Sequence, residues 1–196
     1  INLDIDKDFK KSLVLGDQIG LKDKEGFVLA TMIVEDIWKP NLTNEAKKVY
    51  GTRDIKHPAV DYLMNVSNQY YVGGEVQILQ FPKHYDFMDY RHKPDELKYI
   101  FKKKKWNKVV AFQTRNPLHK AHIEMTKLAM RKYGANLLIH PVVGLTKPGD
   151  VNHYTRVRCY KHAIKKYPKE SSMLSLIPLA MRMGGPREAL LHAIIR

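Results

Sequence analysis

The sequence predicts an α/β protein in which a β-rich N-terminal part precedes a part built on a parallel sheet. Residues 1 to 82 contain short runs of strand-forming residues separated by turn signals. From Lys108 onward, short apolar runs alternate with segments of helical periodicity, which is the pattern of βαβ units. An aperiodic stretch at residues 81–93 separates the two patterns. We therefore expect two domains, at residues 1–86 and 87–196.

The first domain should contain two strands and two short helices. Residues 26–34 are rich in strand formers and follow a Lys-Glu-Gly turn, and residues 75–79 follow a pair of glycines. Between them, residues 44–50 and 57–66 have the spacing of short helices. No group of catalytic residue types stands out here, so we expect the chemistry in the second domain.

The second domain should begin with a helix and a buried strand. Pro94 suits the first turn of a helix, and the acids Asp95 and Glu96 complement its positive end. Residues 109–112 form a short apolar run, which suits a strand that is buried on both faces.

Helical periodicity recurs three times after that strand. The first helix ends at Gly134 and carries its apolar positions on one face: Leu118, Ala121, Met125, Leu128 and Ala129. A second helix covers residues 157–167 and should pack through Val157, Tyr160, Ile164 and Tyr167, and a third starts at Pro186. Strands at residues 137–143 and 173–177 alternate with these helices, so we expect a parallel sheet with right-handed crossovers.

Composition excludes several classes of protein. The 196 residues are 44% hydrophobic and 28% charged, which is typical of a globular chain. No apolar stretch approaches the ~18 residues needed to cross a bilayer. Cys159 is the single cysteine, which excludes a disulfide framework within the chain and predicts a reducing, cytoplasmic compartment. The sequence starts at Ile1 and stops inside an amphipathic pattern, so we expect a fragment of a longer protein.

The charge of the chain favours an anionic partner. There are 34 Lys and Arg against 20 Asp and Glu, which gives a net charge of +14. The densest run, at residues 102–105, suits the solvated C-terminal end of a helix. The sequence contains no aromatic RNP stretch, GxxG clamp or zinc knuckle of the kind that binds RNA. Charge alone therefore leaves nucleic acid, an acidic membrane and small phosphate or sulfate ligands open.

Residue types able to do chemistry gather at residues 113–122, Gln-Thr-Arg-Asn-Pro-Leu-His-Lys-Ala-His. This segment begins where the first parallel strand ends, at the edge where such sheets bind ligands. We expect Asn116 to cap the following helix and Pro117 to occupy its first position. The N–H groups of that helix end would attract a phosphate, and Arg115 offers a planar fork for a tetrahedral oxyanion.

A pair of histidines follows in the same segment. His119 and His122 lie three residues apart, so both should project from one face of the first helical turn. Two imidazoles there can donate hydrogen bonds to phosphate oxygens as charge shifts during phosphoryl or nucleotidyl transfer. A metal site is disfavoured because no acid lies between the histidines and the sequence suggests no third ligand. No side-chain nucleophile is evident either, since Cys159 falls among packing residues of a helix.

Three segments, in this order, closely resemble the ATP sulfurylases (sulfate adenylyltransferases). They are residues 113–122, residues 144–150 with 153–158, and residues 176–189. The family more often has Arg at the position of Lys120. The resemblance implies a partial PUA-like domain followed by a Rossmann-like nucleotidyltransferase domain that lacks its C-terminal part, including a glycine-containing loop of the ATP site. The 196-residue chain could therefore be inactive on its own.

The resemblance also implies a reaction and a set of site residues. ATP and sulfate would give adenosine 5′-phosphosulfate and diphosphate, with Mg²⁺ accompanying ATP and no metal held by the protein. Sulfate would be bound by Gln113 and Arg115, and ATP by Gln113, Thr114, Arg115 and Asn116. The catalytic positions would be Thr114, Arg115, Asn116, His119 and His122, with the two histidines as transition-state stabilisers. Sulfate has no proton to remove near neutral pH, so positioning and charge stabilisation must supply the rate.

A second set of residues could line an anionic pocket: Lys147, Asp150, Arg156, Arg158, Arg182 and Arg187. Each could instead be solvated, because Lys and Arg on helices usually are. Asp150 could also cap the helix that begins near Val151.

Two alternatives stay open. An adenylyltransferase of the HxGH type shares the strand, the turn and the paired histidines, although residue 121 is Ala rather than Gly. A basic nucleic-acid-binding module led by the PUA-like half would bind RNA tightly and with a strong dependence on salt. Of the three, we expect the sulfurylase, with neither nucleic acid nor membrane as a partner. A homo-oligomer is compatible with the sequence.

Overall fold

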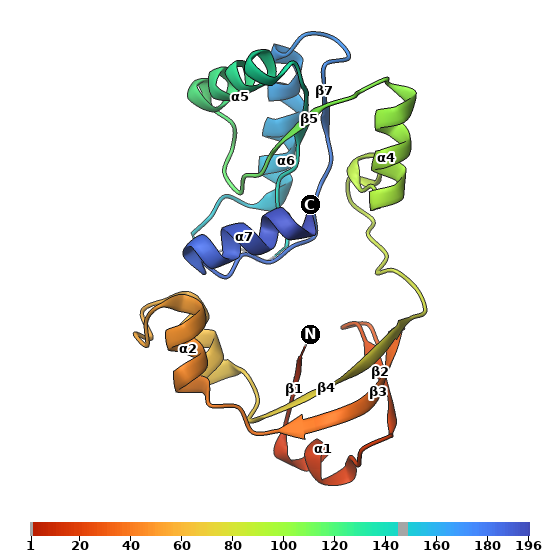
Figure 1. Cartoon of the computed structure of the whole chain (residues 1–196), viewed down its shortest axis with the longest axis vertical. Helices are drawn as coiled ribbons and strands as arrows, with labels where there is room; N and C mark the ends of the chain where they lie inside the picture. The colour runs from red at the N-terminus through yellow and green to blue at the C-terminus, as the bar shows by residue number, and fades with distance from the viewer. Residues whose placement is uncertain (1, 145–148) are drawn as a thin grey trace. The chain divides into compact units, whose positions relative to one another are not determined.

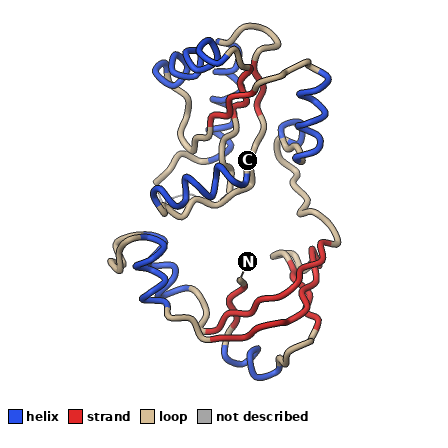
Figure 2. Tube along the Cα trace, in the orientation of Figure 1, coloured by secondary structure: helices blue, strands red, loops and turns tan. Residues whose placement is uncertain are grey.

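The computed structural model describes residues 2–144 and 149–196, and Figures 1 and 2 show its helices and strands. Its contacts divide the chain into two compact units. We call residues 1–84 with 183–196 the β unit and residues 85–182 the α/β unit. Because residues 183–196 group with the β unit, the expected domain boundary between residues 86 and 87 stays a prediction.

The β unit contains a four-stranded antiparallel sheet in the order β1-β4-β3-β2. Its strands are β1 (Leu3–Ile5), β2 (Gln18–Lys22), β3 (Val28–Trp38) and β4 (Tyr70–Ile78). Met32 and Val34 are two residues apart on β3, so both point to the same face, and they pack with Val72 of β4 in the core of the unit. Both expected strands of the first domain are thus confirmed, and each is longer than the sequence pattern indicated.

Short helices complete the β unit: α1 (Lys7–Ser12), α2 (Leu42–Tyr50), α3 (Pro58–Asp61), a π turn (Tyr62–Val66) and α7 (Gly185–Ile195). These confirm the helices expected at residues 44–50 and 57–66 and after Pro186. His57 links two of these segments. Its Nδ1 accepts the Ala59 N–H (3.3 Å), so its Nε2 donates to the carbonyl of Met183 (2.9 Å).

The α/β unit is built on three parallel strands in the order β5-β6-β7, which confirms the expected parallel sheet. The strands are β5 (Val109–Phe112), β6 (Asn136–Ile139) and β7 (Ser172–Leu174). Phe112, Ile139 and Leu174 lie side by side in register and face the same core. Ala111, on the other face of β5, is exposed. The expectation that residues 109–112 are buried on both faces is therefore wrong, because one face of β5 packs against the core through Val110 and Phe112 while the other is exposed at Ala111.

The helices of this unit are α4 (Pro94–Lys103), α5 (Lys120–Tyr133) and α6 (His153–Ala163), with 3₁₀ turns at Met88–Tyr90 and Ile164–Lys166. Ile123 of α5 and Val157 of α6 pack against Leu137 and Ile139 of the central strand. In the described part of the chain, no helix has the length and apolarity to cross a membrane.

The buried face of α5 differs from the expected one. Met125 and Leu128 are 51% and 58% exposed, whereas Thr126 is buried. The Thr126 hydroxyl lies 2.8 Å from the carbonyl oxygen of His122 and 2.7 Å from the hydroxyl of Tyr167. A polar residue with satisfied hydrogen bonds therefore occupies the core side, which apolar periodicity alone could not indicate.

Candidate active site

The loop that joins β5 to α5, residues 113–118, lies at the carboxyl edge of the parallel sheet. Backbone hydrogen bonds hold it beside the chain that leaves β6: His140 N–H donates to the carbonyl of Phe112 (2.9 Å) and Val142 N–H to that of Thr114 (3.0 Å). The loop therefore lies at the edge predicted from the sequence. We call it the 113–118 loop below.

A hydroxyl-centred turn shapes the middle of this loop. Thr114 Oγ1 accepts the N–H of Asn116 (3.0 Å) and lies 3.0 Å from the Asn116 carbonyl oxygen. The α5 helix begins only at Lys120, and His119 is its N-cap residue. The expectation that Asn116 and Pro117 start the helix is thus wrong, because the turn around Thr114 uses the backbone of Asn116 first.

The two histidines of the segment lie in contact. The ring centroids of His119 and His122 are 3.8 Å apart, and those of Phe112 and His122 are 5.5 Å apart. Burial, and then the charge of His119, lower the pKa of His122, so its ring is neutral near pH 7. Its Nδ1 accepts the N–H of His119 at 3.5 Å, which places the ring proton on Nε2. His122 can therefore donate one hydrogen bond from Nε2.

Arg115 forms an ion pair with Asp150, and the two side chains are only 22% and 11% exposed. One guanidinium nitrogen is held in this way, so the direction of the planar fork is fixed while its remaining N–H groups can bind a ligand. The alternative that Asp150 caps the next helix is wrong. Asn152 does so, accepting the N–H of Tyr154 at 2.9 Å.

Two residues of α6 hold the loop from the core side. The Arg156 guanidinium donates from Nη1 to the carbonyl of Arg115 (2.9 Å), and the Tyr160 hydroxyl donates to the carbonyl of Asn116 (2.9 Å). Burial raises the pKa of Tyr160 to about 12, so this hydroxyl keeps its proton. Sequence reasoning treated Tyr160 as a packing residue only. The sequence did contain a signal for this role: Arg156 and Tyr160 carry polar groups one helical turn apart, beside the apolar Val157.

The remaining predicted residues are placed less centrally. Gln113 is half-buried at the end of β5, whereas Arg158 and Arg182 are exposed. Arg187 lies on α7 of the β unit. Lys147 lies outside the residues that the structure describes. Of the second set, the structure therefore brings Asp150 and Arg156 to the loop.

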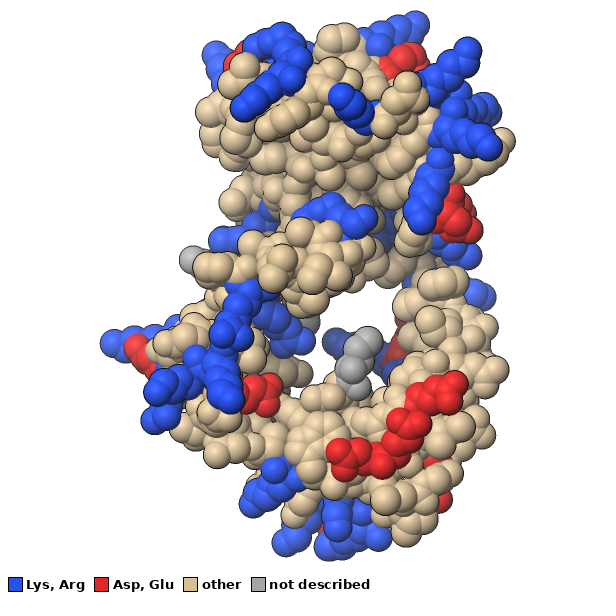
Figure 3. Space-filling view, viewed as in Figure 1, with Lys and Arg blue, Asp and Glu red and all other residues tan. Residues whose placement is uncertain are grey.

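The excess positive charge belongs to one unit. Residues 85–182 contain 21 Lys and Arg against 7 Asp and Glu, a net charge of +14, whereas the β unit contains 13 of each sign. In the view of Figure 3, blue side chains spread over the α/β unit with few red ones among them. The unit that carries the 113–118 loop thus provides the field that attracts anions.

Comparison with protein families matches residues 88–196 to the model of the ATP-sulfurylase family and residues 1–81 to that of a PUA-like domain. The first match covers more than half of the chain and includes the loop, the histidine pair, Asp150 and α6. The chain belongs to the ATP-sulfurylase family. The resemblance seen in the sequence is confirmed, and so is the fold class, a PUA-like domain with a parallel-sheet α/β part.

Individual members of the ATP-sulfurylase family match the whole chain. The sulfate adenylyltransferase of Schizosaccharomyces pombe is 52% identical over 198 residues, which cover 100% of this chain and 40% of that protein. That of Saccharomyces cerevisiae is 50% identical over 196 residues, covering 38% of it. The chain thus spans about two fifths of the length of these curated relatives. A solved structure, the hexameric APS kinase from Thiobacillus denitrificans, matches 100% of this chain and 34% of its own with a TM-score of 0.78 and 27% identity.

A charged network fixes the start of α6 in the α/β unit. Asp86 accepts from Nη2 of Arg91 (2.7 Å) and lies 3.0 Å from Nε2 of His153, the first residue of α6. Burial tends to raise the pKa of Asp86, but the hydrogen bonds from His153 and Arg91 outweigh it and hold the pKa below its ordinary value. The network therefore ties the helix that carries Arg156 to the segment before α4.

We expect Asp86→Asn to destabilise the protein at pH 7, with an effect that fades in acid. Because the pKa of Asp86 is lowered on folding, its carboxylate contributes stability above its ordinary pKa, near pH 4, and loses that contribution as the pH falls through the folded value. Urea unfolding of variant and parent between pH 3 and pH 7 measures this. Asp89→Asn, an exposed acid three residues away, is the control. A difference that stays constant down to pH 3 would contradict the expectation.

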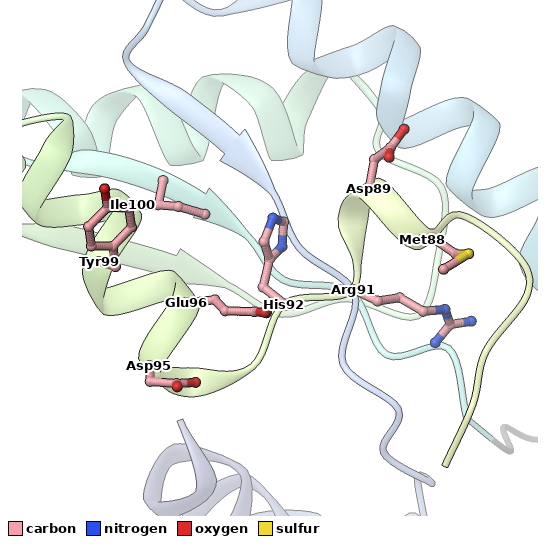
Figure 4. Close-up of a pocket in the computed structure, with 8 residues that line it drawn as sticks. All are labelled: Met88, Asp89, Arg91, His92, Asp95, Glu96, Tyr99 and Ile100. Atoms are coloured by element: carbon pink, nitrogen blue, oxygen red, sulfur yellow. The ribbon is translucent and has the colours of Figure 1, made fainter. Parts of the chain in front are cut away.

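A pocket of about 500 Å³ lies elsewhere in the α/β unit, and the eight residues that line it all fall between 88 and 100 (Figure 4). Its polar groups hold the surrounding segment together. The carboxylate of Glu96 accepts the N–H of Lys93 (2.7 Å), and Nδ1 of His92 lies 3.1 Å from the hydroxyl of Ser175. We interpret this pocket as part of the scaffold beside β7.

Proposed function

We propose that the full-length protein transfers the adenylyl group of ATP to sulfate, forming adenosine 5′-phosphosulfate and diphosphate. The observation that carries the proposal is the placement of Arg115 and the His119–His122 pair on one short segment at the carboxyl edge of the sheet. In this reaction a sulfate oxygen forms a bond to the α-phosphorus while the bond from that phosphorus to diphosphate breaks. No side-chain nucleophile is required.

Sulfate binding is assigned to Arg115 and Gln113. Sulfate is a tetrahedral dianion, and a guanidinium offers two parallel N–H donors to such a group. Because Asp150 fixes one nitrogen of Arg115, the free edge of the fork is oriented before the anion arrives. This pre-orientation favours a single attack direction of the bound sulfate, which is how positioning accelerates a two-substrate reaction.

ATP binding is assigned to Gln113, Thr114, Arg115 and Asn116, and stabilisation of the transition state to the histidines. Negative charge grows on the leaving diphosphate as the bond to the α-phosphorus breaks. The Nε2–H of His122 is a donor suited to a phosphate oxygen there, and His119 lies against it. Thr114 and Asn116 hold the turn that joins the anion site to the helix.

Mg²⁺ enters this proposal as part of the ATP substrate, where it neutralises phosphate charge. Over residues 2–144 and 149–196, no three His, Cys, Asp or Glu side chains group as ligands for a metal ion. The carboxylate beside the loop, Asp150, is already paired with Arg115. We therefore assign no residue of this chain to the ion.

The alternatives have weaker support. The HxGH adenylyltransferases share the paired histidines, but this chain has Ala121 between them and matches the sulfurylase family over residues 88–196. A nucleic-acid module led by the PUA-like part would need positive charge on that part. The β unit has a net charge of zero, so it lacks the electrostatic basis for such binding.

Release of diphosphate by the full-length protein tests the proposal. With MgATP, we expect release to require sulfate or the isosteric dianion molybdate and to be absent with pantetheine phosphate. Release that requires pantetheine phosphate would transfer the protein to the HxGH class, and tight, salt-sensitive RNA binding without turnover would favour the nucleic-acid module.

The 196-residue chain alone is expected to be inactive, because residues of the ATP site would be missing. Light scattering on the full-length protein tests whether it forms the homo-oligomer that is compatible with the sequence.

A further inference from the structure

We propose that Arg156 and Tyr160 of α6 are positioning residues, which set the conformation of the 113–118 loop by binding its carbonyl groups. Neither side chain needs to touch a substrate. The proposal rests on the proposed function of the loop as the sulfate and ATP site, and it adds two residues to the machinery of that site.

Three consecutive carbonyls of the loop have partners on its core side. That of Thr114 accepts the N–H of Val142 (3.0 Å), that of Arg115 accepts from Arg156 (2.9 Å), and that of Asn116 accepts from Tyr160 (2.9 Å). In a planar trans peptide the carbonyl and the following N–H point in opposite directions. Fixing these carbonyls toward the core therefore directs their oxygens, which would repel an anion, away from the ligand side.

Arg156 also places a positive charge beneath the loop. Its side chain is only 2% exposed, and it donates to two carbonyls, those of Arg115 and Val142 (3.0 Å). Within the described residues no carboxylate lies at ion-pair distance from it, and its Nε is buried without a hydrogen-bond partner. A buried charge without a counter-ion is costly. An anion bound on the other side of the loop would offset that cost, so Arg156 should strengthen anion binding without contact.

The chain supplies a matched control for the tyrosine. Tyr167 is buried in the same core as Tyr160, but its hydroxyl lies 2.7 Å from that of Thr126 rather than beside the loop. Thr126 keeps its hydrogen bond to the carbonyl of His122 when the Tyr167 hydroxyl is removed. Tyr160→Phe and Tyr167→Phe thus delete the same atom from one core, but only Tyr160→Phe removes a donor from a loop carbonyl, that of Asn116, which then keeps only its contact with the Thr114 hydroxyl.

The experiment compares these two variants in the full-length protein. Hydrogen–deuterium exchange of the peptide that covers residues 113–118 should accelerate in Tyr160→Phe and stay at the parent rate in Tyr167→Phe. In the diphosphate assay, kcat should fall about tenfold in Tyr160→Phe, the effect of one buried hydrogen bond, and by less than twofold in Tyr167→Phe. Equal exchange and equal kcat in the two variants would overturn the proposal.

Two substitutions of Arg156 separate charge from hydrogen bonding. Arg156→Lys keeps the charge and Arg156→Gln keeps a donor, so the KM for sulfate should rise at least fivefold more in the Gln variant. Equal KM values would overturn the role of the charge, and the tyrosine pair decides the positioning role if the Arg156 variants fail to fold. If the parent protein shows no sulfate-dependent turnover while the exchange contrast holds, the proposed function fails and the positioning of the loop stands.

Discussion

Replacing His122 with Ala in the full-length protein is expected to slow sulfate-dependent diphosphate release by about 10²–10³-fold, the effect of removing one preorganised donor from an anionic transition state. The ring lies against those of Phe112 and His119, and its Nδ1 accepts the His119 N–H. Its Nε2–H is thus fixed in direction. The loss should appear in kcat, with the KM for ATP changed by less than threefold.

Two controls accompany this prediction. His122→Asn keeps an N–H donor of shorter reach and should retain more activity than His122→Ala. His162→Ala removes an exposed histidine of α6 and should leave kcat unchanged. Should His122→Ala keep kcat within twofold of the parent, the assignment of the histidine pair to the transition state would be wrong.

Arg115→Ala should lower kcat/KM for sulfate by about 10³-fold, because bidentate, charge-assisted hydrogen bonds to the anion are lost. The substitution also removes the ion-pair partner Arg115 from the carboxylate of Asp150, which is only 11% exposed. We expect that to destabilise the fold by about 1–3 kcal/mol. Steady-state kinetics with sulfate varied and urea unfolding measure the two effects separately.

The double variant Arg115→Ala, Asp150→Asn distinguishes binding from folding. Removing the charge of Asp150 should restore most of the lost stability, since the carboxylate that lost Arg115 is replaced by a neutral amide, but none of the lost activity. Asp150→Asn alone should weaken the orientation of Arg115 and lower kcat while leaving the guanidinium free for anions. Recovery of activity in the double variant would show that Arg115 serves only to neutralise Asp150.

Local sequence signals predicted the elements that form the α/β unit. The apolar run at residues 109–112 and the glycine at position 134 gave a strand and the end of a helix where the structure has them. They failed where a side chain competed with the backbone. The Thr114 hydroxyl accepts the N–H of Asn116, so α5 begins four residues later, at Lys120. Thr126, a polar residue, lies on the buried side of that helix. Propensity and periodicity contain no term for such hydrogen bonds.

The candidate site, too, was predicted only in part from the sequence. Residues 113–122 are contiguous, so their proximity and their place after a strand could be predicted from the sequence. Asp150 and Tyr160 approach the loop from 35 and 44 residues away. Asp150 was expected either to line an anionic pocket or to cap a helix, and Tyr160 to pack in the core, because each identity is compatible with several roles until the partner is known.

By itself the sequence determined the family, the parallel sheet and the decapeptide at its carboxyl edge, since these depend on residue identities and spacings along the chain. Only the tertiary structure decided that α6 holds this loop by its carbonyls and that Asp150 orients Arg115. Such contacts join segments distant in sequence, and a hydrogen bond between them depends on a distance and an angle that only the packing of β5, β6 and α6 defines.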